Sequence, residues 1–406
     1  MAVRVTKDAH RHLRKQHPWI YNESLVSISH TGESGDLAVI FDDDRNFSGI
    51  GLWDPNSPIC IKLLHTGKPT TVNAAFWAKK VATSIERRRP LLDDPATNAY
   101  RLIHGENDRM PGIVVDLYAN VAVAKIYTDA WIPHLPALVP VLAEQLEALS
   151  SDGTLSLIIR FARSVEQQPD LGLIEGAPLY GPPPVEPVMF LENGLIFEAH
   201  PTSGQKTGHF LDQRVNRALI RDLSDGARVL DVFSCTGGFS VHAAAGGAHE
   251  VHSVDLAAPA IEAAKRNMTH NHDVESVAAC THVGHHGDAF EVMEGLARRG
   301  EIFDVVIIDP PSFAQRQASV DGAIAAYEKL TRLGLALTRD GGTHLQASCS
   351  SRVSADEFFA IVHYTARREE VELREFDRTS HPIDHPIGFT QGAYLKALYA
   401  TVHRTG

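Results

Sequence analysis

The stretch "RVLDVFSCTGGFS" at residues 228–240 decides the fold of this chain. Its apolar beginning predicts a buried strand, and Gly237 and Gly238 then turn the chain into a helix that continues through "FSVHAAAGG". A glycine turn lets the backbone approach a ligand closely, and the amides of the helix N-terminus suit an anionic group. A single strand, turn and helix decide little, so the question is whether the unit repeats.

Strands and helices alternate through the rest of the chain. Further strands are predicted in "EVHSVDL", "HVGHHGDA", "FDVVIIDPP" and "GTHLQASCSS", with a helix after each of them. Near-continuous apolar strands separated by helices predict an α/β fold with a Rossmann-like, mostly parallel, doubly wound sheet. "VELREF" and "AYLKALYATVHR" have no helix between them, so the last strand is expected to run antiparallel, at the end of the sheet.

Two smaller parts precede this sheet. Residues 1–70 contain short apolar runs between Asp, Asn, Gly and Pro residues, which predicts a small β-rich module. A helix that starts near 72 and ends before Pro90, three strands, a helix over 132–149 and the strand "LSLIIRF" predict a central α/β domain. "GAPLYGPPPVEP" (176–187) is expected to be a linker, because its prolines and glycines continue neither helix nor strand. The predicted domains are 1–70, 71–185 and 186–406.

Composition is that of an ordinary globular protein, with 44% hydrophobic and 22% charged residues among 406. No apolar run approaches the ~20 residues of a membrane span, and no apolar segment follows the basic N-terminus as in a signal peptide. The four cysteines are far apart and show no disulfide or metal spacing, which predicts a reducing cytoplasm. The 22 histidines match no zinc pattern, so no metal is expected.

The net charge of −12 by itself argues against nucleic-acid binding. The distribution of the charged residues along the chain is more informative than this sum. "ERRRP" at 86–90 is one basic cluster, and residues 1–20 form another against Asp8 alone. Solvated surface charge explains each cluster as well as nucleic-acid binding does. The basic residues of the N-terminal cluster are Arg4, Lys7, Arg11, Arg14 and Lys15.

Acidic residues end the first four predicted strands. Asp255 ends the second strand, 24 positions after Asp231, where a carboxylate can bind both hydroxyls of a ribose. Asp288 ends the third strand and can reach an adenine amino group. Asp309 begins "DPPSF", whose two prolines make the chain rigid, so that Asp309 would face whatever lies beside a bound cofactor; an Asp-Pro turn alone would also explain the motif. The pattern lacks G-x-G-x-x-G, so it favours an adenosine cofactor over a dinucleotide.

With these motifs the chain resembles the class I S-adenosylmethionine-dependent methyltransferases, and most closely the RlmI-type family of large-subunit ribosomal RNA cytosine-C5 methyltransferases. "KQHPWIYNESL" and "DPNSPICIKLL" resemble parts of its N-terminal PUA domain, a small RNA-binding β-barrel, and "RLIHGENDRMPGIVVDLY" resembles its central domain. "GQKTGHFLDQR" (204–214) is the most specific signature, followed in family order by "FSCTGGFS", "IIDPPSF" and "ASCSS". Two features depart from the family: Cys235 stands where an aromatic residue is common, and the net charge is acidic.

The resemblance implies S-adenosylmethionine as cofactor and large-subunit ribosomal RNA as partner. Arg11, Arg14 and Lys15 are the expected RNA contacts, and a homodimer is among the assemblies left open. For Asp212 and Arg214 a structural ion pair is the alternative to a cofactor contact. The expected cofactor contacts are Phe210, Asp212, Gln213, Arg214, Asp231, Phe233, Ser234, Cys235, Thr236, Gly237, Asp255, Leu256, Asp288, Asp309 and Pro310.

Cys349, in "QASCSS", is the predicted nucleophile. Taken alone, a free cysteine is more often a small buried hydrophobe. Its place at the end of the fifth strand, beside the strand that ends at Asp309, favours a thiolate that adds to carbon 6 of cytosine, with Asp309 holding the base edge. Two alternatives stay open: methylation of a ring or exocyclic nitrogen, and a non-catalytic RNA-binding ribosome-assembly factor, against which the intact acids argue.

Overall fold

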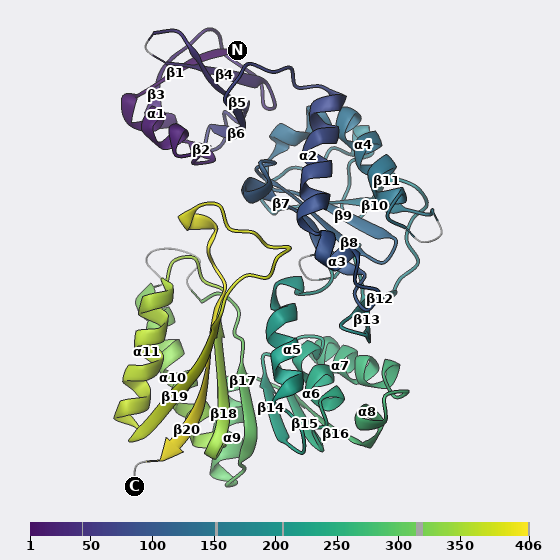
Figure 1. Ribbon diagram of the computed structural model, residues 1–406, viewed down its shortest axis with the longest axis vertical. Helices are drawn as coiled ribbons and strands as arrows, with labels where there is room; N and C mark the ends of the chain where they lie inside the picture. Colours follow the sequence, from purple (N-terminus) through teal and green to yellow (C-terminus); the bar gives the residue numbers. More distant parts are fainter. Residues whose placement is uncertain (43, 151–152, 205–206, 314–319, 405–406) are drawn as a thin grey trace. The chain divides into compact units, whose positions relative to one another are not determined.

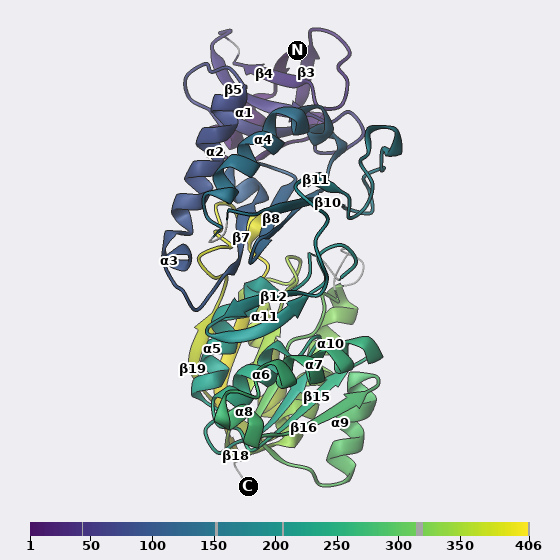
Figure 2. The same ribbon diagram turned by 90° about the vertical axis from the view of Figure 1, so that its right-hand side faces the viewer.

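The computed structural model describes residues 1–42, 44–150, 153–204, 207–313 and 320–404, drawn in Figures 1 and 2. The chain divides into two compact units. The first contains Met1–Leu191, Ala199–Leu211 and Ile383–Gly392, and the second contains Glu192–Glu198, Asp212–Pro382 and Ala393–Gly406.

A six-stranded sheet in the order β2-β6-β5-β4-β1-β3 forms the N-terminal part of the first unit. Helix α1 (Lys7–Arg14) begins after Thr6, whose hydroxyl accepts a hydrogen bond from the amide of Ala9. This helix was not predicted from the sequence, because only Ala9 and Leu13 among its eight residues are buried. The strands are β1 (Ala2–Val5), β2 (Trp19–Ile20), β3 (Leu25–Ile28), β4 (Leu37–Phe41), β5 (Phe47–Trp53) and β6 (Ile61–Thr66).

A five-stranded sheet in the order β11-β10-β9-β8-β7 follows in the same unit. The prediction of a linker at 176–187 is wrong for Pro178–Tyr180, which form strand β11. In this strand Tyr180 pairs with Leu157 of β10. An edge strand tolerates proline, since one side of its backbone needs no partner. The elements are β7 (Ala99–His104), β8 (Ile113–Tyr118), β9 (Val121–Ile126), β10 (Ser156–Phe161), β11 (Pro178–Tyr180), α2 (Ala74–Arg87), α3 (Arg89–Leu92) and α4 (Leu135–Glu147).

The segment Ile383–Gly392 also belongs to the first unit, although it lies near the end of the sequence. Arg88 is fully buried and pairs with both carboxylate oxygens of Asp108, at 2.9 and 2.7 Å. The same guanidinium donates to the carbonyl of Asp384 at 2.9 Å, and the Asp384 carboxylate accepts the amide of Arg101 at 3.0 Å. The late segment therefore completes a buried polar network of the first unit.

The second unit contains a seven-stranded sheet in the order β16-β15-β14-β17-β18-β20-β19. Strands β14 to β18 are mutually parallel, and β20 runs antiparallel to both of its neighbours. The predicted Rossmann-like sheet with an antiparallel last strand is confirmed. The strands are β14 (Arg228–Val232), β15 (Glu250–Asp255), β16 (Thr281–His286), β17 (Phe303–Ile308), β18 (Thr338–Ser348), β19 (Val371–Thr379) and β20 (Lys396–Arg404).

The position of the last strand differs from the prediction. Strand β20 does not lie at the end of the sheet, because it is inserted between β18 and β19. The apolar sequence of β20 is buried over most of its length, whereas β19 alternates polar residues and is largely exposed. Burial of the more apolar strand therefore decides which of the two forms the edge.

Helix α10 packs against both α9 and α11, and helix α6 packs against both α5 and α7 (Figures 1 and 2). None of the helices in the described ranges is long and apolar enough to cross a membrane. The remaining elements are β12 (Val188–Glu192), β13 (Leu195–Ala199), α5 (Arg214–Asp222), α6 (Gly238–Ala245), α7 (Ala258–His270), α8 (Glu275–Ala279), α9 (Ala289–Arg298), α10 (Val320–Leu337) and α11 (Ala355–Arg368).

Candidate active site

The turn between β14 and α6 has an unusual backbone. Phe233, Cys235 and Gly237 have φ angles of 65°, 49° and 76°, all in the left-handed region. This conformation is unfavourable for a residue with a β-carbon, and such strain is concentrated at functional sites. Its amides are fixed, because Ser234 donates to the carbonyl of Val254 at 2.9 Å.

The two glycines of this turn are required by packing. A β-carbon on Gly237 would lie 2.7 Å from the Ala264 side chain in α7. A β-carbon on Gly238 would lie 2.9 Å from Cδ of Arg217 in α5. The two glycines were expected to allow close approach of a ligand. In the structure, helices α7 and α5 occupy the space next to their α-carbons.

Asp231, near the end of β14, is fully buried. Its Oδ2 accepts the amide and the hydroxyl of Ser240, at 3.1 and 2.6 Å. Its Oδ1 has no hydrogen-bond partner among the described residues. Burial, with contributions from the charges of Asp309 and Asp255, raises the pKa of Asp231 to about 7. A buried oxygen without a donor fits a ligand that brings a donor or a positive charge.

Asp255 ends β15 and is half-buried, and its carboxylate is fixed by two backbone amides. Oδ2 accepts the amide of Cys235 at 2.9 Å, and Oδ1 accepts the amide of Ala257 at 2.8 Å. Each carboxylate oxygen can accept a second hydrogen bond, so two acceptor positions remain. The neighbouring Leu256 is 70% exposed, an apolar surface suited to a flat ring. Thr236 is held through its carbonyl, which accepts from Asn267 at 2.8 Å.

Asp288 is the N-cap of α9 and is exposed. Its Oδ1 accepts the amides of Phe290 and Glu291, at 2.9 and 3.2 Å. The structure therefore gives this residue a local role that the sequence analysis did not foresee.

Asp212, Gln213 and Arg214 are buried in the second unit. The hydroxyl of Tyr394 donates to Oδ2 of Asp212 at 2.9 Å, and Arg214 lies 3.9 Å from Glu192. Gln213 accepts a hydrogen bond from Asn216. Phe210 is half-buried in the first unit, and residues 205 and 206 of the signature lie outside the described ranges.

Cys349 immediately follows β18, and its Sγ lies 3.8 Å from the carbonyl oxygen of Pro310. Asp309 directly precedes Pro310, and its amide donates to the carbonyl of Val232 at 3.3 Å. Burial raises the pKa of Tyr327 to about 12, with contributions from the charges of Cys349 and Asp309. The ends of β14, β17 and β18 thus bring Asp231, Asp309 and Cys349 together in one region of the second unit.

The four cysteines are all free, and they differ in reactivity. Burial raises the pKa of both Cys60 and Cys280 to about 11, which disfavours their thiolate forms. Cys235 lies in the turn after β14, and Cys349 directly follows β18; both are half-buried, as is Cys280.

Three residues near Cys349 were missed by the sequence analysis. Tyr327 exchanges a hydrogen bond of 2.8 Å with the hydroxyl of Ser348, and Lys396 is buried at the start of β20. Tyr394 contacts Asp212 as described. A signal for Lys396 was present, because a lysine inside the apolar run "AYLKALYA" has to be buried with its charge satisfied.

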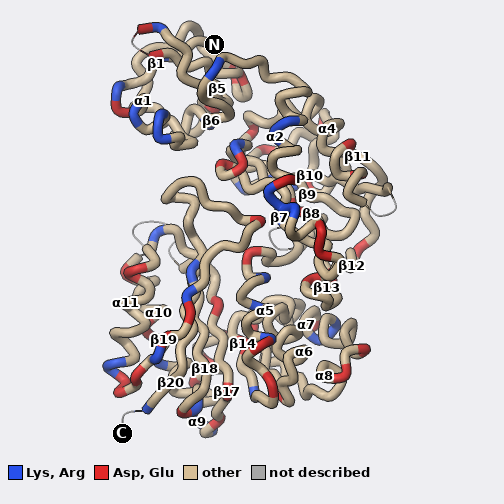
Figure 3. The backbone as a smooth tube through the Cα atoms, in the orientation of Figure 1, with Lys and Arg blue, Asp and Glu red and all other residues tan. Residues whose placement is uncertain are grey.

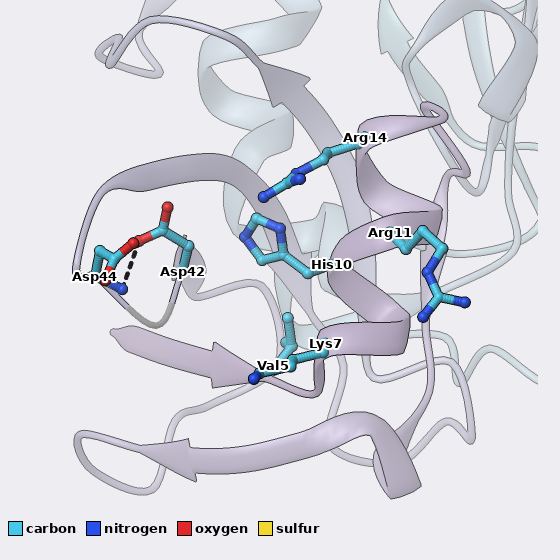
Figure 4. Close-up of a pocket in the computed structure, with 7 residues that line it drawn as sticks. All are labelled: Val5, Lys7, His10, Arg11, Arg14, Asp42 and Asp44. Carbon is cyan, nitrogen blue, oxygen red and sulfur yellow. Dashed lines mark hydrogen bonds between the residues drawn. The ribbon is translucent and has the colours of Figure 1, made fainter.

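Arg11 and Arg14 line a pocket of about 350 Å³ in the first unit, and Lys15 follows at the exposed C-cap of α1. Figure 4 shows Arg14 extending toward the loop that carries Asp42 and Asp44, whereas Arg11 points away from it. Basic residues also gather along α1 in Figure 3. The full lining is Val5, Lys7, His10, Arg11, Arg14, Asp42 and Asp44.

The cluster "ERRRP" is less basic at the surface than its sequence indicates. Arg88 is fully buried against Asp108, so its charge is neutralised inside the first unit. Arg87 also contacts Asp108, at 2.9 Å, and Arg89 pairs with Glu86 at 3.2 Å.

Two segments of the chain match known protein families. Residues 174–400 match the family described as S-adenosylmethionine-dependent methyltransferase, and residues 3–66 match a PUA-like domain. A protein of Deinococcus radiodurans named ribosomal RNA large subunit methyltransferase is 42% identical over 404 residues, covering 98% of this chain and 97% of that protein. A ribosomal RNA large subunit methyltransferase I of Shewanella amazonensis is 31% identical, covering 98% and 99%.

Solved structures share the fold. A candidate S-adenosylmethionine-dependent methyltransferase from Streptococcus mutans has a TM-score of 0.81 at 22% identity, covering 99% of this chain and 100% of that one. A candidate methyltransferase complexed with S-adenosylhomocysteine has a TM-score of 0.82 at 23% identity and the same coverage. The chain therefore belongs to the S-adenosylmethionine-dependent methyltransferases, in the family of the ribosomal RNA large subunit methyltransferases I, with a PUA-like domain at its N-terminus.

Proposed function

We propose that this enzyme forms 5-methylcytosine in large-subunit ribosomal RNA through a covalent bond between Cys349 and carbon 6 of the target base. The names of the relatives supply the class of RNA. The observation that carries the choice of atom is the position of Cys349, whose Sγ lies 3.8 Å from the carbonyl of Pro310, next to Asp309. In a nitrogen methyltransferase this thiol would have no catalytic role, and Cys349 would only be a packing residue.

The residues of the second unit fit S-adenosylmethionine, which supplies an electrophilic methyl group on a sulfonium. Asp255 offers two acceptor positions for the two ribose hydroxyls, and Leu256 offers an exposed apolar surface for the adenine. Asp231 offers a buried oxygen without a donor to the positively charged part of the cofactor. The strained turn at 233–237 lies between these two acids and fixes its amides beside them.

Cys349 would act by making carbon 5 of cytosine nucleophilic. Its thiolate adds to carbon 6, a sulfur–carbon bond forms, and the electron pair of the carbon 5–carbon 6 double bond becomes available at carbon 5. After methylation, loss of the proton from carbon 5 and departure of the thiolate restore the aromatic ring. Asp309 lies where it can hold the edge of the base while charge develops.

The first unit would hold the RNA through its phosphates. Arg11, Arg14 and Lys15 lie on and directly after α1, and Arg11 and Arg14 line its pocket. Such contacts orient the nucleic acid and carry little sequence information. The domain limits 1–70, 71–185 and 186–406, a cytoplasmic setting and a homodimer stay predictions.

An RNA with 5-fluorocytosine at the target position tests the proposal. Thiolate addition and methylation proceed on this base, but fluorine does not leave as a proton does, so the adduct persists. The wild-type enzyme should give a covalent complex that survives denaturing electrophoresis. Cys349→Ser should give neither complex nor turnover, and its affinity for the cofactor should stay close to that of the wild type.

Cys235→Ser is the matched control, because Cys235 is also half-buried and lies in the turn after β14. This variant should still form the complex. A complex that persists without Cys349 and disappears without Cys235 would exchange their roles. Methylation of RNA by Cys349→Ala would favour a nitrogen target, and a protein that methylates no RNA fraction would favour the assembly factor.

A further inference from the structure

Lys396 is a buried cation beside the proposed nucleophile. It begins β20, where it pairs in register with Ser348, the residue before Cys349. Its residue is 6% exposed. Its Nζ donates to the carbonyls of Ser350, Val353 at 2.6 Å and Tyr394 at 3.3 Å. These bonds use all three hydrogens of the ammonium group.

The acceptors of Lys396 are neutral carbonyls. Across the described ranges, no carboxylate oxygen lies within 4.0 Å of its Nζ. A carbonyl oxygen satisfies the hydrogen bond and leaves the unit charge of the ammonium uncompensated. Two of these carbonyls belong to the turn at 350–353, which directly follows Cys349. The ammonium therefore both fixes this turn and places a positive charge near it.

The electrostatics of Lys396 and Cys349 are coupled. Burial lowers the pKa of Lys396 to about 8, and negative charge on Cys349 or Glu357 raises it. Lys396 is thus still mainly protonated at neutral pH. The coupling is reciprocal, because a negative sulfur that favours the ammonium is equally favoured by it.

Among the described residues, the other groups coupled to Cys349 or to Lys396 do not supply this positive charge. Asp309, at the end of β17, is acidic and disfavours a thiolate. Tyr327, from α10, has its pKa raised to about 12 and stays neutral. Glu357, from α11, couples to Lys396 and accepts hydrogen bonds from Ser354 at the N-terminus of that helix. Among these neighbours, only the lysine favours a negative sulfur.

We propose that Lys396 is a positioning residue that holds the turn after Cys349 and favours the thiolate form of that cysteine. The role in catalysis rests on the proposed function, in which Cys349 is the nucleophile. The electrostatic part concerns the protein alone and can be measured without RNA.

The test follows the alkylation of Cys349 by iodoacetamide as a function of pH, with each cysteine resolved by mass spectrometry of its peptide. Iodoacetamide reacts with the thiolate, so the midpoint of the rate profile reports its formation. In the wild-type protein the midpoint should lie below the ~8.5 of a free cysteine. Lys396→Met should raise it by about one pH unit, which is a tenfold lower rate at pH 7.

Two further variants separate charge from structure. Lys396→Arg keeps a positive charge and should keep most of the downward displacement of the midpoint. Lys329→Met removes a half-exposed lysine of the same unit, which pairs with Glu294 at 2.9 Å, and should leave the midpoint unchanged. If the role of Lys396 were purely structural, Lys396→Met would lower the alkylation rate of Cys349 at every pH and would leave the pH midpoint unchanged.

The possible results distinguish the proposed role of Lys396 from the proposed role of Cys349 as nucleophile. A wild-type midpoint at or above that of free cysteine refutes the inference, whether or not Lys396→Met folds. An unchanged midpoint in a folded Lys396→Met, together with a 5-fluorocytosine complex in the wild type, refutes the inference alone. A midpoint that moves as expected, without any such complex in the wild type, refutes the nucleophile and leaves the influence of Lys396 on Cys349 standing.

Discussion

Replacement of Asp255 by alanine should strongly weaken the binding of S-adenosylmethionine. Two of its acceptor positions are occupied by the amides of Cys235 and Ala257, which leaves two for ribose hydroxyls. A hydrogen bond to a charged group contributes about 1.5–3 kcal/mol. Loss of one such bond corresponds to a dissociation constant roughly 10- to 150-fold higher. This is a lower bound, because the two amides also lose their acceptor and the turn loses its support.

Isothermal titration calorimetry with S-adenosylmethionine, and with S-adenosylhomocysteine as the product, measures the effect. Asp255→Asn should be similarly impaired, because its amide nitrogen would face one of the two backbone N–H groups. Glu262→Ala is the control, since this exposed residue of α7 pairs with Lys265 at the surface. A dissociation constant within threefold of the wild type, in an Asp255→Ala protein with an unchanged unfolding midpoint, would refute the assignment of the ribose to Asp255.

Two further predictions concern the RNA and the pH dependence of stability. Replacing Arg11, Arg14 and Lys15 together by alanine should weaken RNA binding and reduce the slope of log affinity against log salt by roughly 2–3, with unchanged cofactor affinity. Equal RNA affinity in this variant would move the RNA surface elsewhere. Asp231 has a folded pKa of about 7 against 3.8 for an unperturbed carboxyl, so its contribution to stability is present below pH 3.8 and lost as pH rises through 7. Wild-type protein without cofactor should therefore lose thermal stability relative to Asp231→Asn from pH 4 to pH 7, and a constant difference in Tm would contradict this.

The sheet of the second unit was predictable because its strands are long, apolar and separated by amphipathic helices. The order of its last two strands, β19 and β20, could not be predicted, because it depends on which of them is more deeply buried in the folded protein. Helix α1 was missed for a related reason: "KDAHRHLR" buries only Ala9 and Leu13, too little to produce a clear apolar period.

The strand-end acids of the site could be located from the sequence, and their hydrogen-bond partners could not. Asp231 and Asp255 are both strand-end acids in the sequence, yet one is fully buried with an oxygen lacking a donor and the other is held by two amides. Lys396 is 47 residues from Cys349 in the sequence, and only the antiparallel pairing of β18 with β20 brings them together. These hydrogen-bond partners and this proximity depend on strand register and side-chain packing, which cannot be predicted from the pattern of residue types alone.

The network of Arg88, Asp108 and Asp384 has a consequence for synthesis of the chain. During translation the N-terminal residues leave the ribosome first, and domains generally fold in that order. Asp384, which accepts hydrogen bonds from Arg88 and Arg101, is made 296 residues after Arg88. The first unit therefore cannot complete this buried network until the segment at 383–392 has been made, which happens after most of the second unit has been synthesised.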